Sequence, residues 1–251
     1  FSTLLITSPL TTVILTWLGT PDGLTLLLTV PFLFTGSSLL LFFLSVLGAV
    51  NHPAFMIAVI EILALRWAAR DGVKFKHILM AGLGLAAGYG LVRWFLTVNQ
   101  IEIVSRVDFM LLMNAGEWLK MNALNFPMSL ASLFNVHWLI LVICMVMFFK
   151  RDRFFYLLAL VILLVNYAFT FFSLDTTRIF SLLSWGVLFE CMFHSYSLAR
   201  TDKDANPQVE RQFLQALVVV GMFSLIAPRY FSWLGEIHTT PFYQFLRKVF
   251  R

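Results

Sequence analysis

Residues 154–172, FFYLLALVILLVNYAFTFF, contain no charged side chain. A helix rises about 1.5 Å per residue, so this stretch is long enough to cross the roughly 30 Å hydrocarbon core of a bilayer. It follows the basic segment 150–153 and precedes Asp175 and Arg178. The stretch predicts a membrane-spanning helix with charged turns on both sides.

The rest of the chain has the same character, because 60% of its 251 residues are hydrophobic and only 12% are charged. Soluble domains average roughly 45–50% apolar and about 25% charged residues. Other apolar runs of suitable length cover residues 1–18, 53–69, 77–98, 136–149, 179–198 and 213–227. We therefore predict an all-α, polytopic transmembrane helix bundle of about seven to nine spans, with interfacial helices, as one transmembrane domain over residues 1–251.

Two shorter apolar runs, 24–35 and 38–50, are separated by Gly36 and Ser37. At about a dozen residues each, they are either thin, tilted spans or a re-entrant pair. Both alternatives return the chain to the same side of the membrane.

Lys and Arg predict the orientation, because cytoplasmic loops of membrane proteins are enriched in them. Three short segments, 66–76, 150–153 and 200–211, hold most of these residues. If they are cytoplasmic, the turns at 20–23, 51–52 and 173–178 and the long loop 99–135 lie on the opposite face. We expect a multi-pass protein of a bacterial-type inner membrane.

Partners follow from the same features. Membrane lipid is an expected partner, and other membrane subunits are a second class of partner. Nucleic acid is not expected, because no run of Lys and Arg alternates with aromatic residues. Cys144 and Cys191 lie in apolar runs and predict neither a disulfide framework nor a metal site.

Two segments are too polar to span and too apolar for water. Residues 107–121, VDFMLLMNAGEWLKM, carry Asp108, Glu117 and Lys120, and they predict a helix lying in the membrane interface. The aromatic, charged tail 230–251 is predicted to do the same. The chain opens in an apolar stretch without a basic segment, which is not a signal-peptide pattern. We expect it to be the later part of a longer protein.

Four glycines, Gly82, Gly84, Gly88 and Gly90, fall in one apolar run. Small residues four apart, as at Gly84 and Gly88, let two membrane helices approach closely. The spacing predicts helix packing here rather than a ligand site.

Ionisable residues in or near a membrane are costly and mark candidate sites. Asp22, in Pro21-Asp22-Gly23, and His52, in Asn51-His52-Pro53, are candidates, although both also fit ordinary turns. Asp175 and Arg178 open the apolar run 179–198, either as a helix cap or as an anion site, and Arg106 lies in the long loop. A basic residue at a helix N-terminus opposes the helix dipole unless an anion offsets it.

Polar residues also occur within the apolar runs: Glu61, Asn166, Glu190 and His194. A transporter would need such residues around a central path. Glu190 and His194 are four apart, and a buried hydrogen-bonded pair suits them better than a metal site, which needs more ligands. Glu61 and Arg66, five apart, are expected to have separate partners.

The block 6–66 resembles the GT-C superfamily of polyprenyl-phosphate-sugar-dependent membrane glycosyltransferases. The resemblance lies in SPLTTVILTWLGTPDGLTLLLTVPFLF (8–34) and LLLFFLSVLGAVNHPAFMIAVIEILALR (39–66), with their Gly-x-x-Asp and polar-Pro turns. It implies a lipid-linked sugar donor, with phosphate near His52, where the family often has Lys. It also implies a catalytic carboxylate upstream of this block.

Three hypotheses follow. The first is a glycosyltransferase of cell-envelope glycan assembly, with Asp22 and Asp175 as catalytic candidates and His52, Arg178 and Arg106 as phosphate-binding candidates. The second is a non-catalytic subunit of a larger membrane complex, and the third is a transporter or flippase. No metal site is predicted, and the need for a divalent cation stays open.

Overall fold

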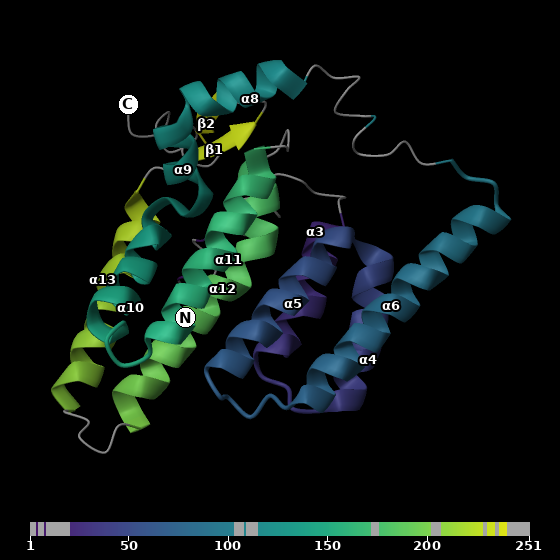
Figure 1. Cartoon of the computed structure of the whole chain (residues 1–251). Helices are drawn as coiled ribbons and strands as arrows, with labels where there is room; N and C mark the ends of the chain where they lie inside the picture. Colours follow the sequence, from purple (N-terminus) through teal and green to yellow (C-terminus); the bar gives the residue numbers. More distant parts are fainter. Residues whose placement is uncertain are drawn as a thin grey trace. The chain divides into compact units, whose positions relative to one another are not determined.

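A computed structural model of the whole chain describes residues 4, 8, 21–102, 108, 115–171, 176–201, 207–227, 230–233 and 236–239. Over these residues the chain is almost wholly helical (Figure 1). The helices are α3 (Asp22–Thr29), the 3-10 helix η1 (Val30–Leu33), α4 (Ser38–Asn51), α5 (Pro53–Ala68), α6 (Phe75–Val98), α8 (Ala115–Leu124), α9 (Phe126–Phe134), the 3-10 helix η2 (Asn135–His137), α10 (Trp138–Phe148), α11 (Arg153–Phe171), α12 (Thr176–Thr201) and α13 (Pro207–Ile226). Two short strands, β1 (Tyr230–Trp233) and β2 (Glu236–Thr239), pair antiparallel.

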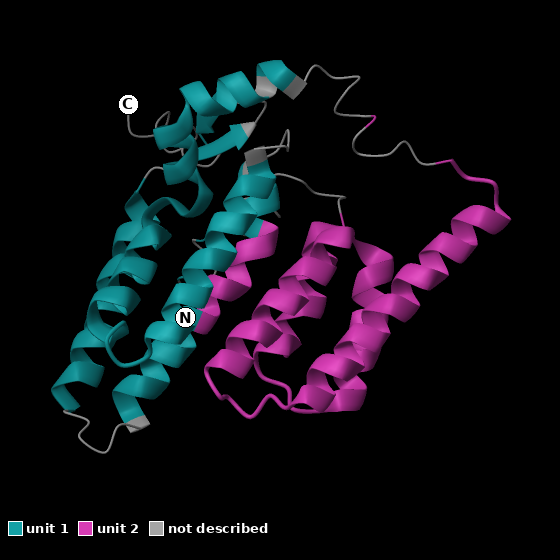
Figure 2. Ribbon diagram, in the orientation of Figure 1, with its two compact units in different colours: residues 1–18, 116–181, 191–251 teal, residues 19–115, 182–190 magenta. Residues whose placement is uncertain are grey.

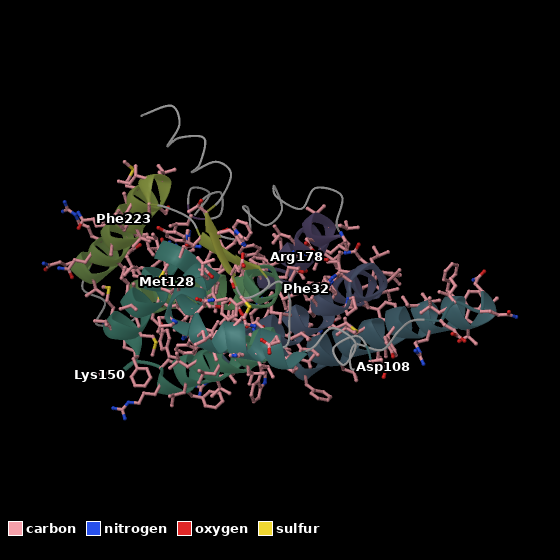
Figure 3. The ribbon with its side chains drawn as sticks, turned by 90° about the horizontal axis from the view of Figure 1, so that it is seen from above. Phe32, Asp108, Met128, Lys150, Arg178 and Phe223 are labelled. Carbon is pink, nitrogen blue, oxygen red and sulfur yellow. The ribbon has the colours of Figure 1, made fainter. Side chains whose placement is uncertain are left out.

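Four helical segments in the described part of the chain are long and apolar enough to cross a membrane. They are Phe75–Val98, Phe126–Phe148, Arg153–Thr170 and Pro207–Ile226. The third contains most of the uncharged run 154–172. Large apolar side chains cover the outside of these helices, including Phe223 on α13, which is half exposed (Figure 3). An apolar exterior of this kind is expected where lipid replaces water.

The chain folds as two compact units (Figure 2). Unit 2 comprises residues 19–115 and the middle of α12, Leu182–Glu190. Unit 1 comprises residues 1–18, 116–181 and 191–251.

In unit 2, the two short apolar runs form separate antiparallel helices. Pro31 has no N–H to donate to an α-helical bond, and the chain tightens from α3 into the four-residue η1 there. The 14 residues of α4 span about 21 Å, less than the bilayer core. Unit 2 therefore has two opposite ends: the Asp22 end, where α3 begins and α4 stops, and the Arg66 end, where η1 and α5 stop.

The glycine spacing in α6 packs this helix against α4, as predicted for Gly84 and Gly88. A Cβ atom at Gly84 would overlap the carbonyl oxygen of Phe42, and one at Gly88 would press on that of Val46. Gly82 and Gly90 have open space instead, so only two of the four glycines serve the packing.

The 24-residue α6 continues beyond the end of α4 (Figure 1). Leu91, Trp94, Phe95 and Val98 in this last part are all about half exposed or more. The projecting end of α6 is thus apolar and open on several sides.

In unit 1, Asn135 connects the helices to the strand pair. Its backbone has φ 50°, which separates α9 from α10. Its side chain accepts from the Tyr230 N–H at 2.9 Å and donates to the Tyr230 carbonyl at 3.0 Å, as a neighbouring strand would. Thr177 Oγ1 accepts from the Ser232 N–H at 2.7 Å.

The predicted interfacial segments are only partly described. Within 107–121, Asp108 and the first residues of α8 are described, and α8 is helical to Leu124. Within 230–251, the described residues form the β1–β2 pair, which the sequence analysis did not predict. The aromatic and β-branched residues Tyr230, Phe231, Trp233 and Ile237 are the signal that favours strands there.

Candidate functional site

Polar side chains converge at the Asp22 end of unit 2. Asp22 lies in the first turn of α3 and is fully buried. Asn51, at the end of α4, donates from Nδ2 to Thr25 Oγ1 at 2.8 Å and to the Pro21 carbonyl at 3.1 Å. Thr25 Oγ1 donates to the same carbonyl at 3.0 Å. The side chain of Asn51 therefore joins the first turn of α3 to the last turn of α4.

A carboxylate fits the position of Asp22 electrostatically. Unpaired backbone N–H groups in the first turn of a helix give that end a partial positive charge, which stabilises an anion. Burial of Asp22 strengthens such interactions, because fewer water molecules screen them. The carboxylate is held within the protein, so an external substrate would reach it only through its immediate neighbours.

His52 follows Asn51 directly and caps α5. Its Nδ1 accepts a hydrogen bond from the Ala54 N–H at 3.1 Å. A neutral imidazole that accepts at Nδ1 carries its proton on Nε2. An imidazolium would convert Nδ1 into a donor and break the cap, so this geometry favours a neutral Nε2–H donor over a cation.

The structure brings together two of the five predicted site residues, Asp22 and His52, in unit 2. Arg178 lies in the first turn of α12, in unit 1, and is partly exposed. Arg106 and Asp175 lie outside the described residues. Asn51 was not predicted as a site residue, although its place between an apolar run and His52-Pro53 was a usable signal.

The Arg66 end holds a second polar cluster. Arg66 was used to predict orientation and was expected to have a partner other than Glu61. The buried guanidinium of Arg66 donates to the carbonyls of Phe32 at 2.7 Å and Thr35 at 3.0 Å. It also donates to Asp71 Oδ2 at 3.1 Å. Phe32 lies inside unit 2 (Figure 3). Arg66 thus caps the C-terminal carbonyls of η1, as basic residues do at helix C-termini.

Glu190 belongs to the part of α12 that is counted in unit 2, and it is 4% exposed. Its Oε1 has no hydrogen-bond partner among the described residues. We have no structural account of this buried carboxylate oxygen.

Unit 1 has a buried polar network of its own. His194 Nε2 lies 3.0 Å from Asp152 Oδ2, and Asp152 Oδ1 accepts from the Phe155 N–H at 3.1 Å. Tyr156 Oη lies 2.7 Å from Ser195 Oγ, which donates to the Cys191 carbonyl. The partner of His194 shown here is thus Asp152, whereas the sequence analysis expected Glu190. These bonds fasten α11 to α12.

The described residues contain no group of three or more His, Cys, Asp or Glu side chains that could hold a metal ion. Cys144 and Cys191 are buried free thiols. No family model, curated protein or solved structure matches this chain.

Proposed function

We propose that this chain is a membrane glycosyltransferase of cell-envelope glycan assembly that uses a lipid-phosphate-linked sugar. The observation that carries the proposal is the convergence of Asp22, Asn51 and His52 at one end of unit 2. These turns come from the block that resembles the GT-C superfamily. The proposal includes about seven to nine spans in a bacterial-type inner membrane, with the Asp22 end on the non-cytoplasmic side.

In the proposed reaction, a hydroxyl or amide of the acceptor attacks the anomeric carbon of the donor sugar. A carboxylate takes the proton from the acceptor, and the bond from the anomeric carbon to the phosphate oxygen breaks. The lipid phosphate leaves with the bonding electrons and needs stabilisation by donors or cations. His52 Nε2–H is one such donor in unit 2. Arg178 and Arg106 are candidate cations on sequence grounds alone.

Asp22 provides the direct test. Asp22 is fully buried, so it would act by holding the Asn51–His52 turn in position. Reconstituted protein carrying Asp22→Asn is therefore expected to transfer sugar about 100-fold more slowly, the scale for misplacing a group at a reacting site. Asparagine keeps the size of the side chain, so folding is checked by elution as a single species. Glu236→Gln, at an exposed carboxylate of β2, is the matched control and should keep full activity. Full transfer by well-folded Asp22→Asn would rule out this assignment.

A second candidate is a non-catalytic subunit of a larger membrane complex. The projecting end of α6 favours it, because Trp94 and Phe95 there have no covering element among the described residues of unit 2. The mass of the particle that is extracted in mild detergent distinguishes a solitary enzyme from a subunit of a larger complex. Two results together would favour the non-catalytic subunit. The chain would be extracted in a stable larger assembly that the double variant Trp94→Ala/Phe95→Ala no longer forms, and the isolated chain would transfer no sugar.

A further inference from the structure

An apolar groove runs between α5 and α6 in unit 2. Its volume is about 680 Å³, within the range of roughly 300–1,000 Å³ typical of ligand pockets. Its lining includes Met56, Ile60 and Trp67 on α5 and Ile78, Gly82 and Tyr89 on α6. Only the tips of Trp67 and Tyr89 are polar. Ile60, Trp67 and Tyr89 are each more than half exposed, so the groove is open along its side.

The groove exists because α6 leans on α4 rather than on α5. Gly84 and Gly88 bring α6 against the backbone of α4, whereas a Cβ at Gly82 would meet nothing within 4 Å. Ala64, Ala81 and Ala86 also leave room along the groove. Its width therefore follows from small residues on both α5 and α6 and does not depend on the conformation of a single side chain.

Positive charge gathers at one end of the groove. Trp67 and Ile78 lie where α5 ends and α6 begins, and the connection between them carries Arg70, Lys74 and Lys76, all exposed. The acidic residue of this connection, Asp71, is bonded to Arg66. Three cations with solvent-accessible side chains thus lie at one end of the apolar groove.

We propose that this groove binds one acyl chain of an anionic glycerophospholipid, whose phosphate lies beside Arg70, Lys74 and Lys76. The surrounding lipid is as apolar as the groove, so burial of the chain does not select one lipid from another. The charge of the headgroup does select between lipids, because basic residues between membrane helices bind anionic headgroups. Binding at this end of unit 2 is independent of the chemistry proposed for the Asp22 end.

Trp67 supplies the readout, because it lines the groove beside the cations. The full chain is placed in nanodiscs with brominated-chain phosphatidylglycerol or phosphatidylcholine at equal mole fraction, and tryptophan quenching is measured. The Trp67→Phe variant defines the share of the signal that belongs to Trp67. Brominated phosphatidylglycerol is expected to quench Trp67 more strongly. This preference should fall about fivefold for each cation removed in Lys74→Gln and Lys76→Gln.

Matched controls separate the site from general lipid contact. Lys150→Gln, at an exposed lysine at the edge of unit 1 (Figure 3), should leave the preference unchanged. Gly82→Leu should fill the groove and reduce quenching of Trp67, whereas Gly90→Leu, also into open space on α6, should not. Each variant is used only if it elutes as a single species.

Two results would overturn the proposal. Equal quenching by the two lipids would mean that Trp67 touches only bulk lipid. Much stronger displacement of the brominated phosphatidylglycerol by an equimolar polyprenyl phosphate than by unbrominated phosphatidylglycerol would identify an isoprenoid as the occupant instead.

Discussion

Replacing Gly84 with alanine is expected to lower the free energy of unfolding by about 1–3 kcal/mol, the usual cost of overpacking. The added Cβ would overlap the Phe42 carbonyl oxygen and lie 2.7 Å from the Ser45 Cβ. Backbone atoms cannot rotate out of the way, so α4 and α6 must separate. Gly84→Leu should prevent the α4–α6 pair from forming. Thermal and denaturant unfolding in detergent measure the change.

The same substitution at Gly82 is the control for this prediction. Both glycines lie inside α6, but a Cβ at Gly82 meets open space. Alanine is the better helix former by about 1 kcal/mol, so Gly82→Ala should stabilise the protein slightly. Opposite signs at two positions of one helix cannot arise from helix propensity. Equal effects at Gly82 and Gly84 would contradict the close packing of α4 and α6.

Replacing Arg66 with methionine is expected to cost about 3–5 kcal/mol of stability, because the buried guanidinium donates two charge-assisted hydrogen bonds to backbone carbonyls. Methionine keeps the length and apolar stem of the side chain. The carbonyls of Phe32 and Thr35 would lose their charged donor, and such bonds contribute roughly 1.5–3 kcal/mol each. The end of η1 would then be released from α5.

Two companion variants show which contact of Arg66 matters. The Asp71 side chain is 63% exposed, so Asp71→Asn should cost less than about 1 kcal/mol, as for surface ion pairs. Arg70→Met removes a neighbouring exposed cation and should change stability by under about 0.5 kcal/mol. If Asp71→Asn were as damaging as Arg66→Met, the ion pair rather than the carbonyl capping would be the main contribution.

The sequence alone predicted where the helices of unit 2 turn. Pro21-Asp22-Gly23, Gly36-Ser37 and Asn51-His52-Pro53 all mark helix boundaries in the structure. Such turns depend on local backbone chemistry, which a few neighbouring residues determine. Apolar length also predicted three of the four helices that are long enough to cross a membrane. The predicted runs 53–69 and 179–198 are not among the four, and the fourth, Phe126–Phe148, begins within the predicted loop 99–135.

Part of the candidate site was also within reach of the sequence. Asp22 and His52 were selected because ionisable residues near a membrane are energetically costly and so mark candidate sites. Both lie at the same end of unit 2. The role of Asn51 was not predicted, because its bonds to Pro21 and Thr25 join segments 30 and 26 residues apart. Nothing in apolar periodicity encodes such partners.

By itself, then, the sequence determined a helical membrane protein, the positions of its turns and the presence of a small-residue face on α6. All three depend on the hydrophobic length, residue spacing and backbone preferences of single segments. Only the tertiary structure decided that Gly84 and Gly88 meet α4 while Gly82 opens a groove, and that Arg66 caps η1. These outcomes depend on which helix faces which, and four chemically identical glycines can be told apart only by their neighbours in space.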